Sequence, residues 1–229
     1  MKKLKRYLPL LIIACISFMA WTLGVHHYFS FDVLRLHHEE LEAYINLHPL
    51  TSFAIYMGVY IAIVGLSIPG ATFMTLLGGF LFGQILGTCL VIVSATVGAT
   101  ILFLSAKLAS EDFLNQKAGP WMSKMKAGFQ ENAFYYLLTL RLIPIFPFVA
   151  INLVAAVFQI PLKTFVVGTF IGIIPGSFVF VSIGNALKDV VLTTDLTPKI
   201  ILEPKFIIAL VGLGTLSLLP VFYKRLHNR

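Results

Sequence analysis

Charged residues are scarce in this 229-residue sequence: Asp, Glu, Lys and Arg together make up 12%, against roughly a quarter in soluble domains. Cysteine is nearly absent, because only Cys15 and Cys89 occur, and both lie inside apolar runs. Two such thiols make no disulfide framework. Hydrophobic residues reach 58%, and the mean hydropathy is +0.90. The composition excludes an ordinary cytosolic enzyme and a disordered chain, and it indicates a polytopic membrane protein.

Apolar runs predict the membrane segments. A helix needs roughly 20 apolar residues to cross a hydrocarbon core of ~30 Å. Four runs have this length and predict single spans: Leu8–Val25, Ile85–Ala106, Thr164–Asn185 and Phe206–Tyr223. The first also resembles a signal peptide, and the residues before Cys15 resemble a lipoprotein cleavage box. Because the apolar run continues past Cys15, we expect an uncleaved signal anchor.

Prolines divide two further apolar runs into hairpins. Leu50–Gly83 breaks at Pro69-Gly70, and Ala133–Phe158 breaks at Pro144 and Pro147. The residue before a proline avoids helical dihedrals, so each break predicts a helix end. The arms of the second run have 11 residues each, or ~16 Å of helix. They are too short to cross, which predicts a re-entrant hairpin; the first run also returns to its own side.

Basic residues orient the chain, since inside loops of membrane proteins are rich in Lys and Arg. With both hairpins returning to their own side, 12 of the 17 basic residues lie inside and four outside. The two termini and segment 107–131 are then cytoplasmic. That segment mixes lysines with large apolar residues and predicts an interfacial helix pair. Segment 26–49 lies outside.

The two hairpins resemble each other. Ile-Pro stands at 68–69 and again at 143–144, and Gln-Ile follows 15 residues after each proline. Because the hairpins open to opposite sides, the two units are inverted, as in many transporters. Glycines at four-residue spacing predict close helix packing, within one chain or between chains of a homo-oligomer; they are Gly79, Gly83, Gly87, Gly168, Gly172 and Gly176.

These features predict an all-α membrane protein: an inverted repeat of two re-entrant hairpins, each followed by a transmembrane helix, with a further span at each end. Its parts are residues 1–49 (signal anchor and outer amphipathic loop), 50–187 (core) and 188–229 (outer loop, C-terminal span and basic inner tail). The core divides into hairpin 50–83, helix 85–106, inner amphipathic segment 107–131, hairpin 132–158 and helix 164–185.

Arg141 is the one charged residue deep in an apolar segment. Burying a cation in a membrane costs at least ~2.5–3.5 kcal/mol on insertion scales. Asp and Glu are absent from 50–110 and from 132–188, so the partners left are hairpin carbonyls, water or a bound anion. Arg141 either ties the hairpin together through carbonyls or binds a lipid phosphate, which a guanidinium fits well. Asn152 is the best second polar group.

No enzymatic or cofactor motif is present. The sequence has no P-loop, dinucleotide fingerprint, zinc-ligand spacing or nucleophile elbow. We therefore expect no cofactor, no metal and no enzymatic activity, and the inside loops account for the net charge of +7 without nucleic-acid binding. Five histidines gather in or beside the outer loop, where an amphipathic helix, a metal site and a pH sensor are the alternatives; they are His26, His27, His37, His38 and His48.

Two motifs resemble the DedA/VTT-domain superfamily, also called the SNARE-associated Golgi proteins. The string from Arg141 through Pro144 and Pro147 to Asn152 resembles the second-hairpin signature. Pro69-Gly70-Ala71, followed by the glycine-rich stretch 78–83, resembles the first. The resemblance covers 50–187 and is closer to the VTT type. It implies two facing re-entrant hairpins and movement of a phospholipid or polyprenyl phosphate between leaflets.

One departure concerns energy coupling. DedA proteins carry a membrane acid before the first Pro-Gly, linked to protons, and here 61–68 contains none. The sequence thus predicts a scramblase- or flippase-like lipid translocator in a bacterial inner membrane. A secondary transporter of a small solute, possible with or without proton coupling, and a non-transporting membrane-organising protein are the alternatives.

Overall fold

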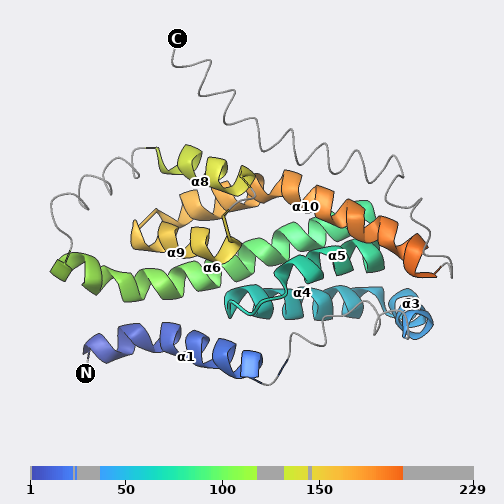
Figure 1. Cartoon of the computed structure of the whole chain (residues 1–229), viewed down its shortest axis with the longest axis horizontal. Coiled ribbons are helices and arrows are strands. Elements are labelled where there is room, and N and C mark those ends of the chain that lie inside the picture. The colour runs from blue at the N-terminus through green and yellow to red at the C-terminus, as the bar shows by residue number, and fades with distance from the viewer. Residues whose placement is uncertain (1, 23, 25–36, 118–131, 144–145, 193–229) are drawn as a thin grey trace, which may run out of the picture.

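The computed structural model describes residues 2–22, 24, 37–117, 132–143 and 146–192, and within these ranges the chain is helical without any strand (Figure 1). Several predicted features lie outside the described residues. They are the span Phe206–Tyr223 with the outer loop before it and the basic tail, most of the inner segment 107–131, the first two outer histidines, and Pro144.

Within the described part of the chain, two helices are long and apolar enough to cross a membrane: α6, Gln84–Lys117, and α10, Leu162–Leu192. Each contains a candidate span of 27 residues. Both helices run past the predicted spans 85–106 and 164–185. α6 continues because the sequence has no helix breaker before Gly119-Pro120. The first part of the predicted inner segment is therefore an extension of α6 and not a separate interfacial helix.

The N-terminal part of the described chain contains two helices of different direction. α1, Lys2–Thr22, packs against α6 and buries Ile13. Its described apolar part, Leu8–Met19, is shorter than the predicted span. α3, His38–Leu47, precedes α4 with a bend of 115°. α3 thus runs across the direction of α4.

Four shorter helices form two pairs. The first pair is α4, Pro49–Gly65, and α5, Ala71–Phe82. The second pair is α8, Ala133–Leu142, and α9, Phe148–Val157, with 10 residues each. The turn of the first pair ends at Gly70, whose φ of 144° strongly favours glycine. Each pair turns at one of the predicted proline breaks.

The two pairs pack on the long helices in a crossed pattern. α4 packs on α6 and α8 on α10, each on the long helix that follows its own pair. α5 packs on α10, and α9 packs on α6, each on the long helix of the other pair. Figure 1 shows α4 and α5 in the half of the molecule next to α3, and α8 and α9 in the opposite half. The two turns therefore face each other near the middle.

The glycines of the predicted stripes differ in their surroundings. In four of them an added Cβ would meet a neighbouring helix: Gly79 and Gly87 would meet backbone carbonyls, and Gly168 and Gly172 would meet side chains of α8. Gly83 instead ends α5 with a φ of 73°. At Gly176 an added Cβ would meet nothing within 4 Å. This last glycine lines a cavity, so the sequence-based assignment of close packing does not describe it.

Candidate functional site

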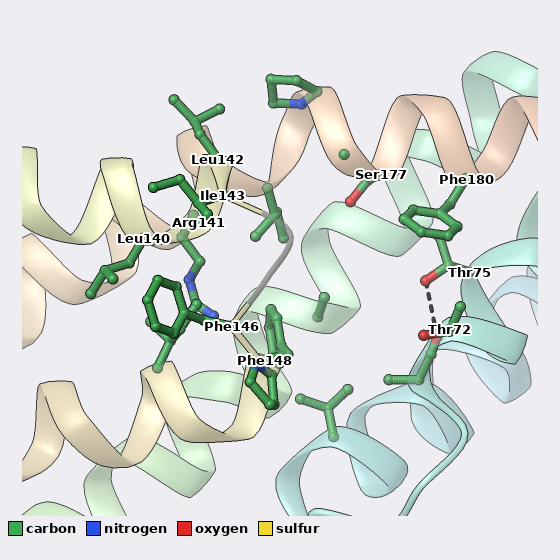
Figure 2. Close-up of a pocket in the computed structure, with 18 of the residues that line it drawn as sticks. Thr72, Thr75, Leu140, Arg141, Leu142, Ile143, Phe146, Phe148, Ser177 and Phe180 are labelled. Carbon is green, nitrogen blue, oxygen red and sulfur yellow. Dashed lines mark hydrogen bonds between the residues drawn. The ribbon is translucent and has the colours of Figure 1, made fainter. Parts of the chain in front are cut away.

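A cavity of about 340 Å³ lies where the two turns meet. Its wall is formed by the ends of α4 and α8, the starts of α5 and α9, and the middle of α10 around Pro175 and Gly176. Apolar side chains make up most of the lining. Figure 2 shows Arg141 on one side of this space and Thr75 and Ser177 on the other. The cavity thus joins both halves of the fold.

Arg141 stands in the last turn of α8 and lines the cavity. Its Nη2 donates to Oδ1 of Asn152 at 2.6 Å and to Oγ1 of Thr169 at 3.0 Å. Asn152 on α9 and Thr169 on α10 are fully buried. The guanidinium therefore links three helices through side-chain oxygens, whereas the sequence had suggested hairpin carbonyls, water or an anion. Thr169 was not singled out from the sequence, because its contact with Arg141 depends on the packing of α8 on α10.

Aromatic rings cover the guanidinium. The Cζ atom of Arg141 lies 4.3 Å from the ring centre of Phe148 and 5.6 Å from that of Phe165. Phe165 in turn stacks on Phe103 of α6 with ring centres 4.1 Å apart. A cation over an aromatic face gains electrostatic stabilisation, and more so when water is excluded. These rings hold the arginine in place without neutralising its charge.

Three buried donors in this cluster have no hydrogen-bond partner within the described part of the chain: Nε and Nη1 of Arg141 and Nδ2 of Asn152. An unsatisfied buried polar group costs about 1–3 kcal/mol, and more when it is charged. All three are donors, and no carboxylate occurs in 50–110 or 132–188. The cluster is therefore chemically complementary to an anion with several acceptor oxygens.

Two helix starts add to the positive potential of the cavity. α9 begins at Phe148, next to Arg141, and α5 begins at Ala71. Neither has a side-chain cap. The first N–H groups of a helix lack intrahelical acceptors and carry a partial positive charge. Both starts and the guanidinium border the same space, so its electrostatic character is that of an anion site.

The wall opposite Arg141 carries hydroxyl groups. The hydroxyl groups of Tyr60 and Thr75 share a hydrogen bond of 2.9 Å, and Thr75 also donates to the Ala71 carbonyl. Thr72 on α5 and Ser177 on α10 line the cavity as well (Figure 2). None of these residues was singled out from the sequence, because single hydroxyls in apolar helices usually bond to the preceding turn.

The remaining sequence candidates lie elsewhere. Pro69 is exposed in the turn before α5, and Pro147 lines the cavity as the residue before α9. Nδ1 of His37 lies 3.4 Å from a carboxylate oxygen of Glu40 on α3. The described residues contain no group of three His, Cys, Asp or Glu side chains that could hold a metal. Cys15 is an exposed free thiol on α1.

Comparison with known proteins identifies the family. The model of the VTT domain matches residues 68–186, more than half of the chain. An uncharacterized membrane protein of Arabidopsis thaliana is 33% identical over 198 residues, which cover 84% of this chain and 66% of that protein. Human Transmembrane protein 41B is 30% identical over 179 residues, covering 76% and 60%. The Transmembrane protein 41 homolog of Dictyostelium discoideum is 31% identical over 180 residues, covering 77% and 51%.

The chain thus spans between half and two thirds of the length of these relatives. No solved structure matches it. The family match includes Pro69-Gly70, Arg141 and every cavity-lining residue except Tyr60 and Val64, and it confirms the resemblance that the two hairpin motifs had indicated. The chain belongs to the VTT domain family of membrane proteins.

Proposed function

We propose that this protein moves a phosphate-bearing lipid between the leaflets of a membrane, as a scramblase or flippase does, through the cavity between two re-entrant hairpins. The observation that carries the proposal is Arg141. It is a buried guanidinium that lines the cavity, has two nitrogens without a hydrogen-bond partner among the described residues and has no carboxylate in its membrane units. A phosphate supplies the charge and the acceptor oxygens that this group lacks.

The physical task in lipid translocation is to carry a polar headgroup through hydrocarbon. An ionised phosphate without partners is very costly in an apolar medium. A guanidinium and the uncapped start of α9 provide counter-charge and donors at the level of the cavity. They would lower the free-energy barrier to movement of the phosphate through the hydrocarbon core, while the acyl chains stay in the surrounding lipid.

The crossed packing of the helix pairs supports the inverted repeat. α8 and α9 have 10 residues each, or ~15 Å of helix, about half of the hydrocarbon core. Each pair rests on both long helices, and the two pairs enter from opposite ends of the fold (Figure 1). Broken helices that meet near the bilayer midplane are where inverted-repeat transporters bind their substrates.

Two contacts support the proposed sidedness. Nζ of Lys188, near the end of α10, lies 3.1 Å from Oε1 of Glu42 on α3. Nζ of Lys107 on α6 donates to the Ile160 carbonyl, between α9 and α10, at 2.6 Å. The first pair joins two segments assigned to the outside, and the second joins two assigned to the inside. We accordingly place α3 outside and both termini in the cytoplasm of a bacterial cell.

The test is a scrambling assay with the full chain in liposomes. A fluorescent phospholipid is placed in both leaflets, and dithionite quenches only the outer leaflet. We expect quenching beyond the outer half with the wild type, a large loss with Arg141→Ala, and partial retention with Arg141→Lys. Lys163→Ala, which removes an exposed cation from α10, is the matched control and should behave like the wild type.

The outcomes separate the alternatives. If folded Arg141→Ala moves lipid at the wild-type rate, the proposed role of the arginine is wrong. If the wild type moves no lipid, including a polyprenyl phosphate, the proposal of lipid translocation fails and uptake of a small solute becomes the next function to measure.

A further inference from the structure

We propose that the cavity selects lipids whose headgroup joins one phosphodiester to neutral hydroxyl groups, as a phosphoglycerol headgroup does, over lipids whose headgroup carries an amine. This inference rests on the proposed function and names the substrate class of the same site. It comes from the contrast between the two walls of the cavity, one cationic and one lined by uncharged hydroxyls (Figure 2).

The charge of the site matches a single phosphodiester. Arg141 is the one charged residue among the described residues that line the cavity, and a phosphodiester carries one negative charge, so the pair is neutral. A zwitterionic headgroup brings an additional ammonium, for which the membrane units 50–110 and 132–188 hold no carboxylate. A buried cation without a counter-charge is strongly disfavoured. The site therefore discriminates against the amine.

The hydroxyl wall offers partners for neutral oxygens. Thr72 on α5 and Ser177 on α10 line the cavity, and within the described chain neither hydroxyl has a hydrogen-bond partner. This differs from the usual behaviour of such residues in helices, shown here by Ser182, whose hydroxyl donates to the Phe178 carbonyl one turn back. Two hydroxyls left open toward one space can each donate to and accept from a ligand hydroxyl.

The size of the cavity agrees with such a headgroup. Its volume of about 340 Å³ is far larger than the ~10–15 Å³ that a single water molecule needs. A phosphoglycerol group fits within this volume and can place its phosphate near Arg141 and its hydroxyls near Thr72 and Ser177. A bare phosphate would leave the hydroxyl wall without a ligand.

Two of the four aromatic residues in the lining, Phe148 and Tyr60, are already engaged by other groups. The face of Phe148 is already covered by the Arg141 guanidinium. The hydroxyl of Tyr60 is engaged with Thr75, which places the polar end of that ring, not its face, at the hydroxyl wall. A cation–π site needs an open ring face within ~6 Å of the cation.

The experiment compares headgroups in the same liposome assay. Lipids with identical fluorescent acyl chains and a phosphoglycerol, phosphoethanolamine, phosphocholine or bare phosphate headgroup are measured in separate vesicles. We expect the phosphoglycerol lipid to move about fivefold faster than each of the others. This is the rate factor expected when one or two additional hydrogen bonds stabilise the headgroup inside the cavity. The double variant Thr72→Val with Ser177→Ala should reduce this preference to less than about twofold. Ser182→Ala is the matched control, since its hydroxyl bonds within its own helix.

The outcomes are distinct from those of the proposed function. Arg141-dependent movement of all headgroups at equal rates would overturn the selectivity and leave lipid translocation standing. A faster amine-bearing lipid, or a preference unchanged in the double variant, would also overturn it. Failure of every lipid to move would instead contradict the proposed function itself.

Discussion

Replacement of Thr169 by valine tests whether Arg141 is held by side-chain oxygens. Thr169 is fully buried on α10, and its Oγ1 accepts a hydrogen bond from the guanidinium at 3.0 Å. Valine has nearly the same shape as threonine and is compatible with an apolar helix, but it lacks the oxygen that accepts the hydrogen bond. The substitution therefore changes the polar contact and little else.

The magnitude follows from the contact that is lost. A hydrogen bond to a charged group contributes about 1.5–3 kcal/mol. Arg141 would keep its hydrogen bond to Asn152. It would lose only the hydrogen bond to Thr169. For a chain of this size, 1 kcal/mol corresponds to a shift of the melting temperature of ~2–4 °C. We expect Thr169→Val to melt roughly 3–12 °C below the wild type.

Thermal unfolding in detergent, followed by circular dichroism, measures this shift. Thr100→Val is the matched control, because the Thr100 hydroxyl donates only to the Thr96 carbonyl of its own helix, and loss of such a bond costs little. Thr169→Ser, which keeps a hydroxyl, should recover most of the stability. Equal melting temperatures for Thr169→Val and Thr100→Val would refute the reasoning, since the bond to Arg141 would then contribute nothing.

Three further predictions follow from packing and sidedness. Gly184→Ala places a methyl group against a backbone carbonyl of α5 and should lower the free energy of unfolding by about 1–3 kcal/mol. In the control Gly58→Ala the methyl group meets nothing within 4 Å, and the free energy of unfolding should rise by about 0.5–1 kcal/mol. Similar melting curves for the two variants would contradict the close packing of α5 on α10. Lys188→Gln removes an exposed ion pair with Glu42 and should cost less than about 1 kcal/mol, so a large fall in melting temperature would show a stronger contact. In a cysteine-free background, a membrane-impermeant maleimide should label Glu42→Cys but not Lys107→Cys in intact cells, and the reverse pattern would exclude the proposed topology.

Much of the fold could be read from the sequence because hydrophobicity and proline act locally. The breaks at Pro69 and Pro147 locate the turns before α5 and α9, since a proline ends a helix wherever it stands. The predicted arms of the second hairpin differ from α8 and α9 by one residue each. The lengths of α6 and α10 were underestimated, because a helix continues into polar sequence until a breaker stops it.

For the candidate site, the sequence identified the unusual residue but not its surroundings. Arg141 was recognisable because a charge inside an apolar segment is costly and no acid stood near it in the chain. Asn152 followed from its place on the return arm. Thr169, 28 residues away from Arg141, could not be found in this way. Its contact exists only because α8 lies on α10, where Gly172 leaves room for the Arg141 side chain.

The sequence by itself determined the membrane class, the two broken helices and the presence of one buried cation, because each of these follows from neighbouring residues. Only the tertiary structure decided that the two helix starts and the hydroxyls of Thr72 and Ser177 border the same cavity as Arg141. The crossed packing of α5 on α10 and of α9 on α6 brings them there. Such packing depends on contacts between segments far apart in the chain, which no local pattern of residues specifies.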